Sequence, residues 1–226
     1  MKQFVFKDSV RIDVKETSLV GELAIPENAK GLILFVQDDP STEVGKSHAA
    51  IAERLNKEGF ATLLFDLLDP EEEKDYENHL DIPLMTEHII NTVYWVEQDD
   101  VTKDLNLGLV GSERGAAAAL SAAAALGDII KAVVAVAGRA DLASPTLSDL
   151  QAPALLLVPG KDEALISFNQ EAHDQIEGIR DMQLVPDATA AFKEPGALEM
   201  AANLVDEWFK KYLEPGKLHP LHQNQP

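Results

Sequence analysis

The chain has 226 residues, of which 46% are hydrophobic and 26% are charged, so its composition excludes disorder of the whole and predicts one globular domain. With 19 Lys and Arg against 39 Asp and Glu, the formal net charge is −20, which disfavours partners such as nucleic acid and anionic membrane surfaces. The absence of cysteine excludes disulfides, a thiol nucleophile and thiolate-ligated metal centres. No apolar run reaches the ~18 residues of a membrane span, and the N-terminus is typical of a strand rather than a signal peptide. We therefore expect a cytoplasmic protein.

Strands and helices alternate along most of the chain. The first two predicted strands form a hairpin, and later apolar runs are typical of strands buried on both faces, separated by helices with amphipathic spacing. In chain order we expect strands at Val10–Val14 and Thr17–Ile25, a strand at 31–36, a helix capped by Ser47 and ending at Gly59, a strand at Ala61–Phe65, an acidic surface turn at Glu71–Asp75, a helix at Ile82–Val96, a strand at Leu105–Val110, a helix at Ala116–Leu126, strands at Ala132–Ala137 and Ala154–Val158, a helix at Ala164–Ile176, a strand at Met182–Val185 and a helix at Gly196–Tyr212.

This alternation predicts an α/β fold with a mostly parallel central sheet of about eight strands and helices on both faces. The opening hairpin adds antiparallel strands at one edge. No internal repeat or linker divides the chain, so we expect residues 1–213 to form a single domain. Residues 214–226 are rich in Pro, His and Gln, and we expect them to form a disordered tail.

The segment Gly111–Gly115 has the sequence G-S-E-R-G and lies between a predicted buried strand and an alanine-rich helix. A strand, a five-residue turn flanked by glycines and a helix are the setting of a nucleophile elbow. Gly111 and Gly115 are needed because so sharp a turn presses its residues against the adjacent strand and helix. The pattern therefore predicts an elbow with Glu113 at its centre.

With this elbow, the chain resembles the dienelactone-hydrolase-like branch of the α/β hydrolases over residues 17–213. The resemblance implies an α/β-hydrolase fold with a site at the carboxyl ends of the strands. The matching stretches, in chain order, are A-T-L-L-F-D-L-L at 61–68, P-E-E-E at 70–73, L-D-I-P-L at 80–84, the elbow at 111–115, V-P-G-K-D-E at 158–163 and F-K-E-P-G-A-L at 192–198.

The resemblance also implies which residues occupy the catalytic positions. The family's serine nucleophile corresponds to Glu113, its triad acid to Asp162, and its triad histidine to Ala190. No histidine lies between His173 and His219, so no small realignment restores the imidazole.

The oxyanion site is altered as well. The loop that carries His-Gly in the family reads Q-D-D-P here, so Gln37 and Asp38, together with Arg114 of the elbow, occupy the oxyanion positions and Asp39 adds a further carboxylate. A serine triad needs a hydroxyl, an imidazole and an oxyanion hole free of negative charge. We therefore expect no ordinary serine esterase activity.

Three hypotheses remain open. The chain could be a pseudoenzyme, inactivated naturally or by design, whose vestigial pocket binds a small molecule. It could be a working hydrolase of a small ester or lactone that uses Glu113 as base or nucleophile. It could bind a hard cation such as Ca²⁺, Mg²⁺ or Mn²⁺ through oxygen ligands from Asp38, Asp39, Glu113 and Asp162.

Simpler roles compete with each of these hypotheses. The same carboxylates could form ordinary ion pairs with Arg114, Arg139 and Lys161. The histidines share no ligand spacing, so surface or capping roles are expected for His48, His79, His88 and His173. The sequence predicts no cofactor, since no phosphate-binding or dinucleotide-binding glycine motif is present.

Overall fold

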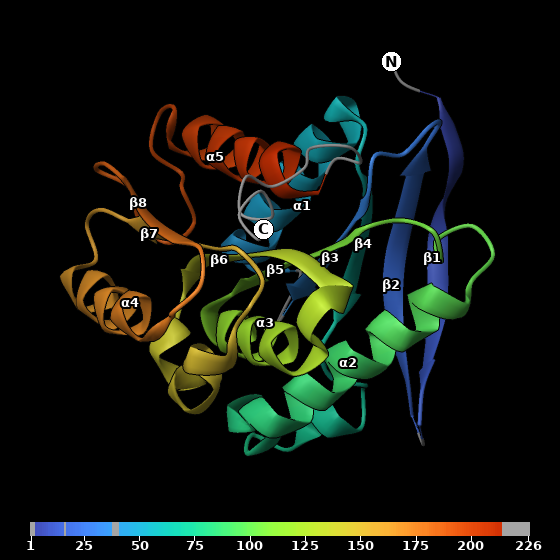
Figure 1. The fold of residues 1–226 in the computed structure, drawn as a ribbon, viewed down its shortest axis with the longest axis horizontal. Helices are drawn as coiled ribbons and strands as arrows, with labels where there is room; N and C mark the ends of the chain where they lie inside the picture. The colour runs from blue at the N-terminus through green and yellow to red at the C-terminus, as the bar shows by residue number, and fades with distance from the viewer. Residues whose placement is uncertain (1–2, 16, 38–40, 214–226) are drawn as a thin grey trace, which may run out of the picture.

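The computed structural model describes residues 3–15, 17–37 and 41–213, and its centre is an eight-stranded sheet with the order β1-β2-β4-β3-β5-β6-β7-β8 (Figure 1). Strand β1 pairs antiparallel with β2, and β2 pairs antiparallel with β4. All other neighbours are parallel. The strands are β1 (Phe4–Val14), β2 (Thr17–Pro26), β3 (Leu32–Gln37), β4 (Ala61–Asp66), β5 (Leu107–Ser112), β6 (Ile130–Gly138), β7 (Ala154–Pro159) and β8 (Arg180–Val185). The predicted fold class is confirmed.

Five α-helices of the described residues cover both faces of the sheet (Figure 1). Helices α1 and α5 pack on one face, and α2 and α3 pack on the other. They are α1 (Glu43–Glu58), α2 (Ile82–Gln98), α3 (Glu113–Leu126), α4 (Glu163–Gln175) and α5 (Ala197–Tyr212), and short 3₁₀ segments lie at Glu72–Lys74, Asn78–Leu80, Gly127–Ile129 and Ala140–Asp149.

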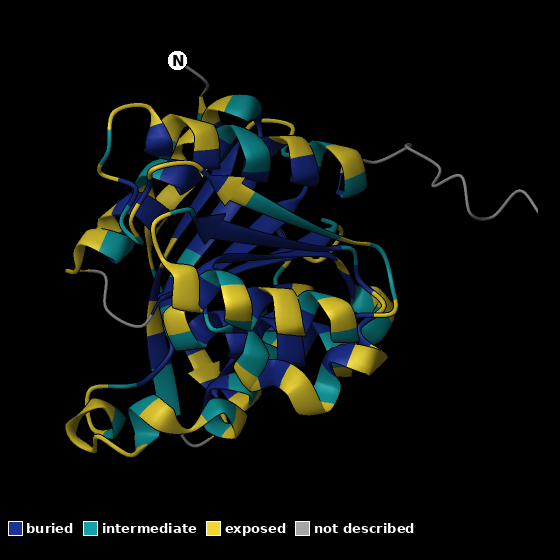
Figure 2. Cartoon of the chain, turned by 90° about the vertical axis from the view of Figure 1, so that its left-hand side faces the viewer, coloured by how far each residue is buried: buried dark blue, intermediate teal, exposed yellow. Residues whose placement is uncertain are grey.

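The two faces of the sheet define two apolar cores. Strands β3, β5, β6 and β7 are buried along nearly their whole length (Figure 2), because parallel strands between two helical layers are shielded from water on both sides. Phe35 and Phe209 belong to the core under α1 and α5, whereas Leu34 and Leu120 belong to the core under α2 and α3. The parallel strands therefore all present their carboxyl ends at one edge of a well-buried sheet.

Two local predictions need correction. Strand β1 begins at Phe4 rather than at Val10, because an edge strand with one solvent-facing side tolerates polar residues such as Lys7 and Asp8. Helix α1 begins at Glu43 and is capped by Thr42, whose hydroxyl accepts a hydrogen bond from the Gly45 amide at 3.1 Å. Ser47, the predicted cap, lies inside the helix and donates its hydroxyl hydrogen bond to the Ala191 carbonyl at 2.6 Å.

Two further segments bear on the predictions. The 3₁₀ segment Ala140–Asp149, which contains Pro145, was not predicted, since it has neither a helical nor a strand-like apolar period. The predicted tail, residues 214–226, lies outside the described residues.

The cap on α1 can be tested directly. Replacing Thr42 with Ala removes the acceptor for the Gly45 amide, and we expect the free energy of unfolding to fall by about 1 kcal/mol. Thr42→Ser keeps the hydroxyl and is the matched control, with stability close to wild type. Urea denaturation followed by circular dichroism measures both, and equal stability of the two variants would show that Thr42 is not the cap.

Candidate functional site at the carboxyl edge of the sheet

The turn between β5 and α3 is the most constrained part of this edge. Ser112 ends β5 and Glu113 begins α3 with no intervening residue, and Glu113 has a φ of 47°. The Glu113 carbonyl accepts a hydrogen bond from the Arg139 amide at 2.8 Å, and Glu113 forms an isolated bridge with Gly138 of β6. A non-glycine residue in the left-handed region costs about 1–3 kcal/mol, so the surrounding packing must hold the turn in place.

Glycine at two positions allows this packing. A Cβ at Gly111 would lie 2.4 Å from the Gly115 carbonyl oxygen, and a Cβ at Gly138 would lie 2.1 Å from the Ala116 Cβ. Both distances are far below van der Waals contact. The chain therefore brings β5, β6 and the first turn of α3 together by removing side chains, and the result presents the Glu113 side chain to solvent.

A narrow crevice separates this turn from α1. Its lining includes Gln37 at the end of β3, His48 of α1, Ser112 and Glu113. The space between its walls is too small to admit a water molecule. The structure thus brings two of the predicted site residues, Gln37 and Glu113, to one place.

His48 also lines this crevice, and the surface or capping role expected for it from the sequence is wrong, because it is buried. Its side chain is 1% exposed, and its ring packs edge-on against Phe35 with centroids 5.9 Å apart. Neither ring nitrogen has a hydrogen-bond partner among the described residues, and desolvation lowers the pKa of His48 to about 4. His48 is therefore neutral near pH 7, and its position on the buried side of α1 carries no spacing signal that points to the turn.

Asp162 and Ala190 line a second hollow of about 400 Å³, together with Lys161, Glu163 and Thr189. The two loops are tied together because the Lys161 amide donates to the Ala188 carbonyl at 3.0 Å. Asp162 caps α4, accepting a hydrogen bond from the Leu165 amide at 2.9 Å. The positions predicted for the triad acid and for the missing histidine therefore face one hollow. The Asp162 carboxylate caps the N-terminus of α4.

Two of the three basic residues near these carboxylates, Arg139 and Lys161, have other partners. Arg139 forms a two-point ion pair with Asp141 and lies over the Phe168 ring, 4.2 Å from its centroid. The Lys161 ammonium lies 3.9 Å from the Glu194 carboxylate. Arg114 forms no ion pair with the described residues. The ion pairs that the sequence offered as a simpler role for Glu113 and Asp162 are thus absent from the part of the chain that the structure describes.

The cation hypothesis stays a prediction. Within residues 3–15, 17–37 and 41–213, no three His, Asp or Glu side chains are grouped so as to hold a metal ion. Asp38 and Asp39, two of the four proposed ligands, lie outside the described residues. No helix among the described residues has the length and apolarity required to cross a bilayer.

An eight-stranded, mostly parallel sheet with an N-terminal antiparallel hairpin and helices on both faces defines an α/β-hydrolase fold. The chain is 37% identical to a dienelactone hydrolase from Anabaena variabilis whose structure it matches with a TM-score of 0.87, over 92% of this chain and 99% of that one. Est1E from Butyrivibrio proteoclasticus has the same fold at 17% identity, with a TM-score of 0.74 over 89% of this chain and 97% of its own. No protein-family model matches the chain.

The chain belongs to the dienelactone-hydrolase-like α/β hydrolases. It is also 38% identical, over 91% of its length, to Mycobacterium tuberculosis proteins that bear the provisional name phosphoribosyl transferase. The match covers 46% of those proteins, so the chain spans about half the length of these curated relatives.

The tight turn predicts a strong response to one added methyl group. Gly111→Ala forces a Cβ against the Gly115 carbonyl, and we expect the free energy of unfolding to fall by about 1–3 kcal/mol or more, as for other overpacked sites. Thermal and urea unfolding measure the loss. An unchanged melting temperature would mean that β5 and α3 are not packed as described.

His48 predicts a pH dependence of stability. Because its pKa is about 4 in the folded chain and about 6.5 when unfolded, the unfolded chain takes up the proton first as the pH falls. The contribution of His48 to the free energy of unfolding should therefore decrease from pH 6.5 downwards, by about 3 kcal/mol in total near pH 4.

His48→Leu removes this titration and the two unpartnered ring nitrogens. We expect the stability of His48→Leu to fall less than that of wild type between pH 7 and pH 4.5 in urea titrations. His79→Gln, at the surface of the 3₁₀ segment Asn78–Leu80, is the control and should follow wild type. Identical pH profiles for all three proteins would contradict the buried neutral imidazole.

Proposed function

We propose that the β5–α3 turn is the counterpart of a nucleophile elbow and that this chain is a pseudoenzyme, a dienelactone-hydrolase-like domain without serine-hydrolase chemistry. The observation that carries the proposal is the residue at the tip of the turn. Glu113 has the left-handed backbone, with a φ of 47°, that places a side chain at the exposed centre of such a turn. It offers a carboxylate where acyl transfer needs a hydroxyl.

The hollow at Asp162 supports the same conclusion. A triad acid orients an imidazole through a hydrogen bond to its Nδ1 hydrogen, but none of the described residues that line this hollow with Asp162 is a histidine, and Ala190 stands at the position implied for one. His48 does not replace the missing imidazole. It lines the crevice at the turn rather than the Asp162 hollow, and no hydrogen bond from the described residues orients its ring.

Glu113 as a nucleophile or general base is the weaker candidate. Either role requires a water molecule beside the carboxylate to complete hydrolysis. The exposed Glu113 carboxylate makes no side-chain hydrogen bond with the described residues that would orient it toward such a water. A neutral histidine with a pKa of about 4 is also a poor base for such a water near pH 7.

A binding role fits the chain better than catalysis. We propose a small molecule as the ligand, in the cytoplasm, rather than nucleic acid or a membrane surface, because the net charge of −20 repels polyanions. Phosphoribosyl transfer is not part of the proposal, since the match to the mycobacterial relatives covers less than half of their length.

Hydrolysis of 4-nitrophenyl acetate tests the proposal. We expect wild type and Glu113→Ser to show only background rates, because a hydroxyl without an imidazole is not activated. Restoring both positions in Glu113→Ser/Ala190→His should give a measurable release of nitrophenol, at least about tenfold above either single variant, since triad members act as a unit.

Two controls make the outcome clear. Ala190→His alone restores the imidazole without the hydroxyl and should stay at background, and circular dichroism checks that each variant is folded. Turnover by wild type that disappears in Glu113→Ala would overturn the proposal and make Glu113 a catalytic residue.

A further inference from the structure

Strand β1 forms one edge of the eight-stranded sheet (Figure 1). It is 11 residues long and contains no proline, and its register with β2 is regular from Phe6 to Val14. Among the described residues, β2 is the only strand that pairs with it. A long and regular edge strand carries a row of backbone groups that can pair with another chain.

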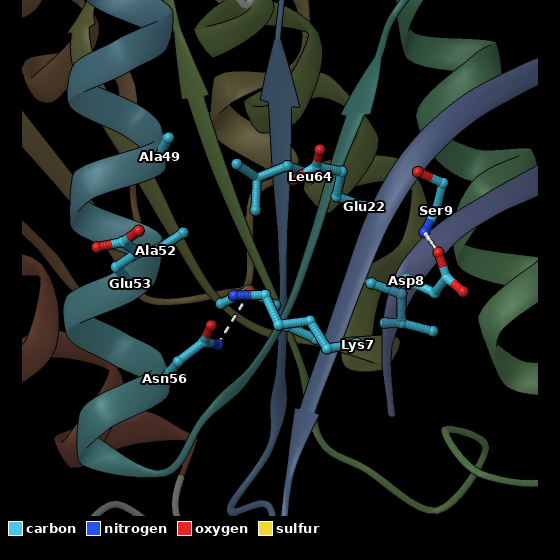
Figure 3. A pocket seen from close by; sticks show the side chains of 12 residues that line it. Lys7, Asp8, Ser9, Glu22, Ala49, Ala52, Glu53, Asn56 and Leu64 are labelled. Atoms are coloured by element: carbon cyan, nitrogen blue, oxygen red, sulfur yellow. Dashed lines mark hydrogen bonds between the residues drawn. The ribbon is translucent and has the colours of Figure 1, made fainter. Parts of the chain in front are cut away.

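Every second residue of β1 points its backbone groups away from β2. In an antiparallel pair, alternate residues exchange both of their backbone hydrogen bonds with the partner strand, and the residues between them point outward. The Ser9 amide donates to the neighbouring Asp8 carboxylate at 2.8 Å rather than to β2 (Figure 3), so Ser9 is one of the outward residues. By the same alternation, Lys7, Arg11 and Asp13 also present their backbone amides and carbonyls at the outer edge.

Charged side chains of both signs share one face of β1. Val10 and Ile12 pack against the core under α2, and strand side chains alternate between the two faces. Lys7, Arg11 and Asp13 therefore lie on the opposite face, where all three are exposed. The whole strand carries two basic and two acidic residues, whereas the chain has 39 acidic against 19 basic residues. This edge thus lacks the charge excess that drives two copies of an acidic protein apart.

The order of these charges is complementary to itself in one antiparallel register. When a two-fold axis passes through Val10, the whole regular stretch of β1 is aligned, and outward residues face outward residues as the hydrogen bonds require. Lys7 of each copy then lies opposite Asp13 of the other, and Ser9 lies opposite Arg11. Moving the axis to Ser9 would place Lys7 opposite Arg11, and moving it to Arg11 would place the two guanidinium groups opposite each other. Opposite charges across a strand pair stabilise it and like charges destabilise it, so the register centred on Val10 is favoured.

We propose that two copies of this chain form a symmetric dimer through β1, in which the two sheets join into one continuous sheet. Backbone hydrogen bonds between the outward residues supply the affinity, as in other cases where a strand is added to a sheet edge. The two Lys7–Asp13 pairs fix the register. The same patch serves on both copies, which is the geometry of a two-fold interface. The interface is separate from Glu113 and Asp162, so it does not depend on the function of the triad positions.

Sedimentation velocity over a series of protein concentrations tests the proposal. We expect wild type to pass from monomer to dimer as the concentration rises. Lys7→Glu places like charges opposite each other in both symmetry-related pairs, and Asp13→Lys does the same with the other sign. Each should weaken dimerisation by about tenfold or more. The double variant Lys7→Glu/Asp13→Lys restores opposite charges and should return the dissociation constant to within about threefold of wild type.

Lys131→Glu, at an exposed position in β6, makes the same change of net charge remote from β1 and should leave dimerisation close to wild type. Ser9→Pro removes an outward amide at a position where an edge strand tolerates proline, and it should weaken the dimer while circular dichroism shows a folded chain. A wild type that stays monomeric at every soluble concentration would overturn the proposal. A dimer that both single charge reversals leave unchanged, or that the double variant does not restore, would overturn it as well.

Discussion

The close approach of β5, β6 and the first turn of α3 is the constraint on which the candidate site depends. A Cβ at Gly111 or Gly138 would collide with backbone or with Ala116, so this contact exists only because side chains are missing. The contact forces Glu113 into a left-handed backbone and fixes the edge of the sheet around it. The crevice with α1 on one side and the hollow at Asp162 on the other take their positions from this packing.

The packing of the turn does not depend on the chemistry of the Glu113 side chain. Glu113 is exposed, and its backbone, not its carboxylate, is what β6 contacts through Arg139 and Gly138. Asp162 keeps a structural role as the cap of α4. The side chains at positions 113 and 162 can therefore change without loss of the fold, because the packing of the turn depends on backbone contacts and on Gly111 and Gly138.

The sequence predicts the fold well where burial decides it. Apolar runs such as Leu32–Gln37 and Ala154–Pro159 are buried along their whole length, and a strand buried on both faces leaves that pattern directly in the sequence. Predictions were wrong where backbone hydrogen bonds decide the structure. The Thr42 cap and the polar start of β1 depend on local hydrogen bonds, and the 3₁₀ segment Ala140–Asp149 has no apolar period.

The sequence predicts the site residues that belong to a recognisable segment of the chain, but it does not predict which residues tertiary packing places beside them. The turn at Glu113 follows from five consecutive residues between a strand and a helix, and the shared hollow of Asp162 and Ala190 follows from the resemblance. The contribution of α1 does not. His48 reaches the crevice, and Ala49 and Asn56 line a separate hollow beside the N-terminal hairpin, from neighbouring turns of one helix. Which face of α1 meets the turn and which meets the hairpin is set by how the helix crosses the sheet. Because that crossing is a property of tertiary packing, a single helix can close one pocket of the fold and leave another open.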